Sequence, residues 1–358
     1  MKTKEIKKLL QKKDKPVALP KKYLGSGSTL LNLACSNNIK GAFISGEYYF
    51  FVGDSASGKT FISLTCLAEA SINPEFDNYR FIYDNSERGA HMSIEKFFGK
   101  KVAERLEAPA TGEDGDEEFS STIEEFYYNI DDAIKDGRPF IYILDSMDSL
   151  SSKDESDKFE ETKKAHRKGT QVAGSYGDGK AKKNSANLRR LIKPLGKSDS
   201  ILIIINQTRD NLGFGFEKKT RSGGNSLRFY TCVEFWSSIK EKIKKTVKGK
   251  PRQLGIVAKI QIKKNRLTGR ERVVYVPIYH SAGIDDVGSC VEYLIDEGHW
   301  KKKGSTINAA EFELKDSVEK VIKHIEKNNL EKDLRDIVND VWNEIEDACV
   351  VKRKKRYE

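Results

Sequence analysis

The sequence predicts an α/β protein with a central, mostly parallel β-sheet that is covered by helices on both faces. Short runs rich in aromatic and aliphatic residues, at 47–52, 80–84, 140–144 and 201–205, are typical of buried strands. Segments with helical spacing lie between these runs, and such alternation favours parallel strands joined by crossover helices. The first run leads into a glycine loop and then a helix, which marks the start of the core.

The composition is that of a soluble, basic protein. Its 358 residues include 33% charged residues and carry a formal net charge of +10, which favours a polyanionic partner. The chain contains no apolar run near the roughly 20 residues of a membrane span, and its start lacks the apolar core of a signal peptide. Five scattered cysteines without a C-x-x-C pair indicate reduced thiols and a cytoplasmic protein, and they argue against a zinc site.

Three regions are expected along the chain. Residues 1–40 form a short basic segment with helices near 5–13 and 30–35, interrupted by prolines and a Gly-Ser stretch. Residues 41–285 form the core, and residues 286–358 form a charged, mainly helical region with a basic tail.

Within the core, apolar spacing predicts helices over 61–70, 93–106 and 121–135, with an acidic turn-rich loop at 111–118. Beyond about residue 228 the pattern changes to strands joined by hairpins. The predicted strands and turns are strands at 231–240, 256–264 and 271–278, a lysine-rich turn region at 240–252, and a turn at 267–270.

The glycine loop fits the phosphate-loop pattern G-x-x-x-x-G-K-[ST]. It reads Gly-Asp-Ser-Ala-Ser-Gly-Lys-Thr over residues 53–60, between a strand and a helix as the motif requires; the alternative is a chance glycine loop. Lys59 would reach the β- and γ-phosphates of ATP, and Thr60 would offer its hydroxyl to Mg²⁺. Backbone N–H groups would wrap the phosphates at the positive end of the helix dipole. The loop residues whose backbone would surround the phosphates are Gly53, Asp54, Ser55, Ala56, Ser57 and Gly58.

Asp145 closes the strand 140–144 in the manner of a Walker B carboxylate, which holds Mg²⁺ directly or through a water. The alternative is that Asp145 caps the next helix. Asp148, three residues later, is expected to be a surface or capping residue. Together with Thr60, Asp145 is the predicted metal site.

Asp84 and Glu87, which follow the second strand, are the candidates for the base that orients an attacking water. We favour Glu87; the alternative is that one or both acids cap a helix beginning near Arg88. Gln207 lies at the end of the strand 201–205, on the same sheet edge as the phosphate loop. Its neutral amide could donate to the γ-phosphate and so report its presence. The alternative is a simple polar strand end.

Two glycine-rich loops with basic residues, at about 169–183 and 208–225, flank these strand ends. Loops of this length inside a compact domain are usually functional. Lysine, arginine and backbone N–H groups suit a phosphodiester backbone. The alternative is a pair of surface loops without a ligand.

These residues together resemble the RecA recombinase family, including phage-encoded relatives of the UvsX type. The resemblance spans about residues 24–304. Its specific parts are 205–210 with 222–230, which are similar to the family's second DNA-binding loop and the helix leaving it, and Lys-Lys-Asn-Arg at 263–266, which resembles the motif that reaches a neighbouring subunit's ATP. The resemblance implies a RecA-type P-loop ATPase core with a β-hairpin extension and a small helical C-terminal region.

The resemblance implies an ATP- and Mg²⁺-dependent recombinase that forms helical filaments on single-stranded DNA, pairs it with homologous duplex and exchanges strands. Glu87 would activate water and Gln207 would couple the γ-phosphate to the second loop. Lys264 and Arg266 would act in trans on a neighbour's ATP. Single-strand-binding and loader proteins are further partners that the family allows. The implied DNA-contacting positions are Lys182, Ser185, Arg189, Arg209, Arg221, Gly223, Gly224 and Asn225.

The sequence also departs from the family. The catalytic acids are one residue further apart than in the usual Asp-x-Glu, Ile94 falls near the place of an adenine-stacking tyrosine, and the tail at 352–356 is basic where that of bacterial RecA is acidic. Two other functions stay open: a ring-shaped helicase or motor on the same core, and a slow-turnover mediator that binds ATP and DNA. Closed rings would favour the first, and negligible ATP turnover the second.

Overall fold

The computed structural model describes residues 21–89, 91–112, 115–168, 170, 179–210, 219–221, 224–354 and 356. The predicted helix at 5–13 lies outside these ranges, as do most of the first glycine loop, the middle of the second, and Gly223. In the part of the chain that is described, no helix is both long and apolar enough to cross a membrane. All five cysteines are free thiols.

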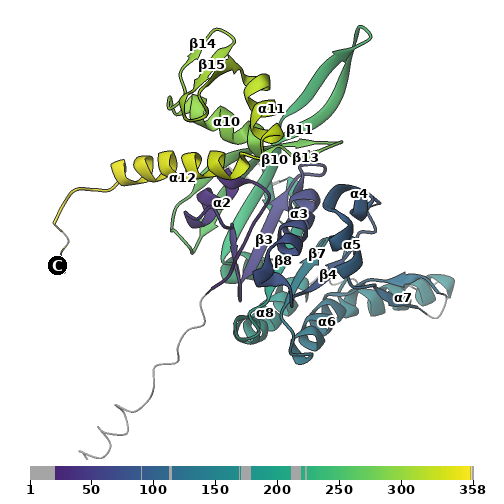
Figure 1. The fold of residues 1–358 in the computed structure, drawn as a ribbon. Coiled ribbons are helices and arrows are strands. Elements are labelled where there is room, and N and C mark those ends of the chain that lie inside the picture. Colours follow the sequence, from purple (N-terminus) through teal and green to yellow (C-terminus); the bar gives the residue numbers. More distant parts are fainter. Residues whose placement is uncertain are drawn as a thin grey trace, which may run out of the picture.

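A sheet of nine strands lies at the centre of the described chain (Figure 1). Its order is β13-β12-β11-β10-β3-β8-β7-β4, with β9 paired to the end of β8. The strands from β10 to β4 run parallel, and those from β10 to β13 run antiparallel. The predicted α/β class is therefore confirmed. The strands are β3 (Tyr48–Gly53), β4 (Arg80–Asp84), β7 (Phe140–Leu144), β8 (Ile201–Asp210), β9 (Lys219–Arg221), β10 (Val233–Val247), β11 (Lys250–Asn265), β12 (Arg272–Tyr279) and β13 (Gly283–Ile284).

Helices cover both faces of this sheet. In Figure 1, α3, α4 and α5 lie on one face, and α6 and α8 lie on the other. The helices predicted in the core are confirmed, except that Gly99, with a φ of 93°, divides the second into two. The helices are α2 (Thr29–Ser36), α3 (Lys59–Ile72), α4 (Ile94–Phe98), α5 (Lys100–Arg105), α6 (Ile123–Lys135), α7 (Lys153–Arg167), α8 (Gly179–Lys197) and α9 (Asn225–Tyr230). Short strands β1 (Tyr23–Leu24) with β2 (Phe43–Ile44), and β5 (Ala110–Thr111) with β6 (Glu117–Glu118), form two-stranded pairs.

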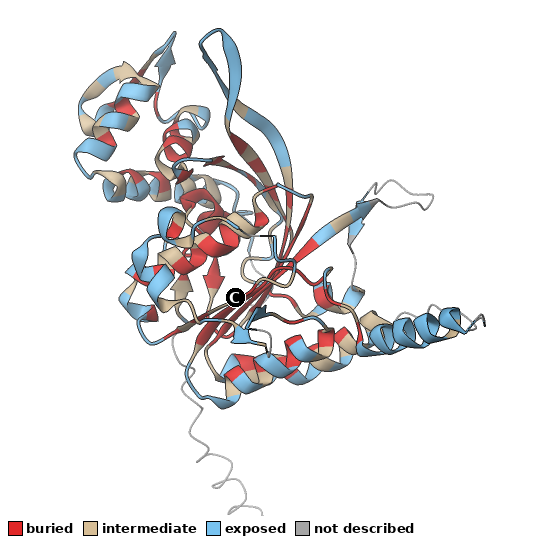
Figure 2. Ribbon diagram, turned by 90° about the vertical axis from the view of Figure 1, so that its right-hand side faces the viewer, coloured by how far each residue is buried: buried red, intermediate tan, exposed pale blue. Residues whose placement is uncertain are grey.

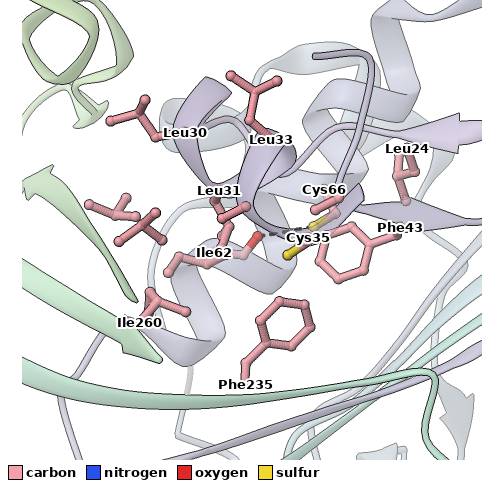
Figure 3. Packing of buried hydrophobic residues seen from close by; sticks show 14 of the residues in the cluster. Leu24, Leu30, Leu31, Leu33, Cys35, Phe43, Ile62, Cys66, Phe235 and Ile260 are labelled. Atoms are coloured by element: carbon pink, nitrogen blue, oxygen red, sulfur yellow. Dashed lines mark hydrogen bonds between the residues drawn. The ribbon is translucent and has the colours of Figure 1, made fainter. Parts of the chain in front are cut away.

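The side chains of β3 alternate between two hydrophobic cores. Tyr49 and Phe51 join the core on the α3 side, whereas Phe50 and Val52 join the core on the α6 side. A strand buried on both faces needs apolar residues at successive positions, which is why these strands read as continuous apolar runs. Figure 3 shows the first core, where Phe235 of β10 lies below α2 and α3.

The hairpin of β10 and β11 is longer than predicted. The region 240–252, expected to be a turn, is paired strand as far as Val247 and again from Lys250. The turn is confined to Lys248 and Gly249, whose φ angles of 52° and 74° are those of a tight two-residue hairpin. Most of this projecting arm is exposed in Figure 2. Backbone pairing, not apolar burial, extends the arm, so its lysine-rich composition concealed the strands.

The C-terminal part contains a small sheet that was not predicted. The sequence predicted helices in this part, and the structure has α10 (Asp286–Asp296), α11 (Val318–Lys327) and α12 (Glu331–Ala348). Between the first two lies a three-stranded antiparallel sheet. Its strands are too short and polar to stand out in the sequence: β14 (Lys302–Lys303), β15 (Thr306–Ala309) and β16 (Leu314–Ser317).

Replacing Phe235 by alanine tests the core beneath the phosphate loop. The ring is fully buried and stacks on Phe51 at a centroid distance of 4.4 Å. We expect Phe235→Ala to lower the free energy of unfolding in urea by about 3–5 kcal/mol through lost burial and a cavity. The exposed Tyr128→Ala on α6 should change it by less than about 0.5 kcal/mol. Equal effects of the two changes would contradict this account of the core.

Candidate active site

The phosphate loop connects β3 to α3 and depends on two glycines. A Cβ at Gly53 would lie 2.3 Å from the carbonyl oxygen of Ser237 on the adjacent β10, so only glycine lets the strands approach this closely. Gly58 has a φ of 91°, and a Cβ there would lie 2.7 Å from Ile278. The Ser237 hydroxyl donates to the carbonyl of Ser57 at 2.7 Å, which ties the loop to the sheet.

Lys59 lies almost fully buried at the start of α3. Its ammonium donates to the carbonyl oxygens of Gly53 at 2.9 Å and of Asp54 at 2.7 Å. Burial lowers the pKa of Lys59, and the charges of Asp145 and Glu87 act in the opposite direction. The ammonium is therefore held at the mouth of the loop, where it can exchange carbonyl oxygens for phosphate oxygens.

Asp145 lies beside Thr60, as the metal prediction requires. The Thr60 hydroxyl donates to the Asp145 carboxylate at 2.7 Å, and Tyr83 donates to the same oxygen at 3.1 Å. Burial raises the pKa of Asp145, while the bond from Thr60 lowers it. Within the described ranges no three His, Cys, Asp or Glu side chains gather as a metal cage would require. The pair of one hydroxyl and one carboxylate instead fits a Mg²⁺ that also binds phosphate oxygens.

Glu87 reaches the end of β8. Its carboxylate accepts a hydrogen bond from the Gln207 amide at 2.9 Å and another from the Ser146 hydroxyl. Its backbone N–H donates to the carbonyl of Asp145 at 2.9 Å. The two residues predicted from separate strand ends thus meet beside Asp145, the predicted Walker B residue.

Asp84 lies in a different environment. It is buried, and its carboxylate accepts bonds from the Ser120 backbone and hydroxyl at 3.0 and 2.6 Å and from Tyr142 at 2.6 Å. The alternative that these acids cap a helix near Arg88 is wrong, because α4 begins at Ile94 and is capped by Ser93. Asp84 is therefore occupied with structural partners, whereas Glu87 is exposed at the site.

Strand β8 continues into the predicted second loop. Residues 208–210 pair antiparallel with 219–221, and we call this pair the β8–β9 ribbon. Arg209 lies in the ribbon, and its guanidinium is 3.5 Å from the carboxylate of Asp148, which also accepts a bond from the Gln207 backbone. The expectation that 208–225 is all loop is wrong for these strand positions, because backbone pairing continues past the apolar run. Asp148 holds the start of the ribbon, a role that its sequence position did not reveal.

The basic residues beside the first loop lie on a helix. The predicted loop boundary at 183 is wrong, since α8 begins at Gly179. The buried residues of this helix recur at helical spacing, which the many charged residues between them obscured in the sequence. They are Asn184, Leu188, Leu191 and Leu195.

Three predicted DNA-contacting residues lie on one face of α8, because they are three and four residues apart: Lys182, Ser185 and Arg189. Ser185 and Asn225 line the same groove of about 680 Å³.

Helix α9 leaves the second loop against α8. A Cβ on Gly224, whose φ is 84°, would lie 2.7 Å from Ala181 of α8. The two predicted DNA-contacting segments therefore adjoin each other. Arg221 belongs to β9, and Gly223 lies outside the described residues.

Lys264 and Arg266 contact the last turn of α9. The ammonium of Lys264 donates to the carbonyls of Arg228 and Phe229 at 2.6 and 2.8 Å, and Arg266 donates to Phe229 at 2.6 Å. Burial, helped by the charge of Arg266, lowers the pKa of Lys264 to about 8. The pair lies at the far end of the second loop from Glu87.

Several residues of the site were missed from the sequence. Tyr83, Ser146, Thr208 and Lys219 each hydrogen-bond to a predicted site residue. Tyr83 and Thr208 stand next to predicted residues in their strands, which is a usable signal. Lys219 had none, because its partner Asp54 is 165 residues away.

Comparison with known proteins places this chain in a family. The family model for the RecA N-terminal domain matches residues 4–285. The chain is 27% identical to Protein RecA of Borreliella burgdorferi (strain ZS7), over 92% of this chain and 84% of the relative. It is 26% identical to Protein RecA of Borreliella afzelii (strain PKo), over 97% and 88%, and 27% identical to chromosomal Protein RecA of Lactococcus lactis subsp. lactis (strain IL1403), over 79% and 66%. With this match, the parallel sheet and the phosphate loop at its edge, the chain belongs to the RecA family and is a RecA-like recombinase.

Proposed function

We propose that this recombinase hydrolyses ATP in response to DNA, and that it assembles as a filament with ATP between subunits. The observation that carries the proposal is the 2.9 Å hydrogen bond between the Gln207 amide and the Glu87 carboxylate. Gln207 directly precedes the β8–β9 ribbon, so one hydrogen bond joins the hydrolytic site to the second loop. A change in the position of Glu87 can therefore move the start of the second loop, and a change in the loop can move Glu87.

The phosphate loop would bind the triphosphate through its backbone N–H groups and Lys59. The buried ammonium already lies between two loop carbonyls. Exchanging these for the negatively charged β- and γ-phosphate oxygens would offset the free-energy cost of burying its charge. Thr60 and Asp145 would hold Mg²⁺. The ion would neutralise charge that develops on the phosphates during hydrolysis.

Glu87 would orient the attacking water and accept its proton. Glu87 is exposed, its backbone is bonded to that of Asp145, and its carboxylate contacts Gln207, which lies opposite Gly53 of the phosphate loop. Gln207 competes for this carboxylate, so a bond from Gln207 to the γ-phosphate instead would leave Glu87 available to water. The nucleotide state would thereby set the position of the second loop.

The DNA-binding surface would consist of the α8 face with Lys182, Ser185 and Arg189, together with the start of α9. Ser185 and Asn225 already line one groove there. Lys264 lines the same groove, and Arg266 donates to the carbonyl of Phe229, another of its lining residues; both would contact the neighbour's ATP in the filament. Electron microscopy with single-stranded DNA and a slowly hydrolysed ATP analogue tests the assembly: we expect open helical filaments, and closed rings would overturn the proposal in favour of a motor.

Two substitutions test which acid is the base. Glu87→Gln should lower DNA-stimulated ATP hydrolysis by about 10²–10⁴-fold while ATP binding persists. Asp84→Asn should keep hydrolysis within a few-fold in the protein that folds, because Asp84 is committed to Ser120 and Tyr142. Phosphate release assays measure both rates, and a larger loss in Asp84→Asn than in Glu87→Gln would refute the assignment of the base.

Lys59→Ala should abolish hydrolysis. The same assay measures its rate, and normal turnover by Lys59→Ala would refute the assignment of Lys59.

The lowered pKa of Lys264 predicts a pH dependence. Contact with a neighbour's phosphate favours the charged ammonium, so this contact weakens as pH rises through about 8. DNA-stimulated hydrolysis should fall roughly tenfold between pH 7 and pH 9, in proportion to the charged fraction. Lys264→Arg, which stays charged, should abolish the fall. Lys263→Arg is the matched control and should retain it; a fall that persists in Lys264→Arg would exclude Lys264 as its source.

A further inference from the structure

Asp54 joins the phosphate loop to the second loop by contacts separate from the Gln207 bond. Its carboxylate accepts hydrogen bonds at 2.5 Å from the Thr208 hydroxyl and from the Lys219 ammonium. Thr208 and Lys219 belong to the two strands of the β8–β9 ribbon. One side chain of the phosphate loop therefore holds both strands of the ribbon.

The geometry of a β-strand explains why this contact is independent of Gln207. Successive side chains of a strand point to opposite faces. Gln207 reaches Glu87, whereas Thr208, the next residue, reaches Asp54. The start of the second loop is thus held from both faces by two different residues of the nucleotide site.

The backbone of Asp54 is also tied to the phosphate-binding lysine. Its carbonyl accepts the Lys59 ammonium at 2.7 Å and the Ser57 hydroxyl at 2.7 Å. Movement of Lys59 towards a phosphate would break the first of these bonds and so alter the position of Asp54. The hydrogen bonds of Lys219 and Thr208 lower the pKa of the Asp54 carboxyl, so the carboxylate stays charged at neutral pH although burial opposes this.

We propose that Asp54 and Lys219 are positioning residues that transmit the state of the phosphate loop to the second DNA-binding loop. The inference rests on the proposed function and adds to it a second contact between the two sites. Loss of the ion pair would leave the phosphate loop and the DNA surface intact but weaken the dependence of one on the other.

The test measures the affinity for a fluorescent single-stranded oligonucleotide with a slowly hydrolysed ATP analogue and with ADP. The ratio of the two affinities is the coupling. We expect Lys219→Gln to reduce this ratio at least about fivefold, the lower end of typical allosteric couplings. Lys219→Arg, which keeps the charge and the donors, should preserve it. Lys327→Gln, which removes an exposed positive charge from α11, outside the proposed DNA-binding surface, is the control for net charge and should also preserve it.

A double-mutant cycle separates this role from direct contact of Lys219 with DNA. If Lys219 acts through Asp54, then Asp54→Asn and the double variant should show the same reduced ratio as Lys219→Gln. A double variant whose loss is the product of the two single losses would overturn the inference. So would a Lys219→Gln protein that loses affinity equally with both nucleotides and shows a smaller salt dependence, since that is the behaviour of a phosphate contact.

The outcomes also distinguish this inference from the proposed function. An unmodified protein whose DNA affinity ignores the nucleotide would refute the proposed function itself. An unmodified protein that responds, beside a Lys219→Gln protein that responds equally, would refute the inference alone. Thermal unfolding midpoints within about 2 °C of that of the unmodified protein would establish that the variants are folded.

Discussion

The parallel pairing of β3 with β8 determines how this site works. Its register places Gly53, where the phosphate loop begins, directly opposite Gln207, where β8 leaves the apolar core. Because the pairing is buried between two hydrophobic cores, the two positions cannot shift independently without exposing apolar side chains. The phosphate loop and the second loop therefore begin at adjacent positions of one rigid strand pair, and short side chains are enough to connect them.

The sequence predicted the parts of this site that follow from strand ends. Apolar runs ending in Asp145 and Gln207, with the phosphate loop between strand and helix, place these groups on one edge of a parallel sheet. The sequence favoured Glu87 over Asp84 as the base, but it did not predict the face of β4 on which Asp84 lies or the partners of that carboxylate. Tyr83 faces Asp145, so Asp84, one residue later, faces the opposite side and meets Tyr142. Glu87, beyond the strand end, returns to the site.

The remaining features depend on contacts that sequence patterns do not contain. The ribbon and the long β10–β11 arm are extended by backbone hydrogen bonds between polar segments, so neither produces the apolar alternation by which strands are recognised. The ion pair of Asp54 with Lys219 joins two residues that are 165 positions apart in the sequence. In contrast, the helical spacing of the buried residues of α8 is present in the sequence, although the many charged residues between them obscure it.

The second loop is restrained at both ends, and this has a consequence for assembly. Glu87 and Asp54 hold its start, while Lys264 and Arg266 hold the last turn of α9 that follows it. In the proposed filament the first pair senses the subunit's own nucleotide, and the second pair exchanges the α9 carbonyls for the neighbour's phosphates. DNA bound to one loop would then be coupled to two nucleotides. Because such coupling is reciprocal, DNA would strengthen ATP binding at both sites, and assembly along the strand would be cooperative.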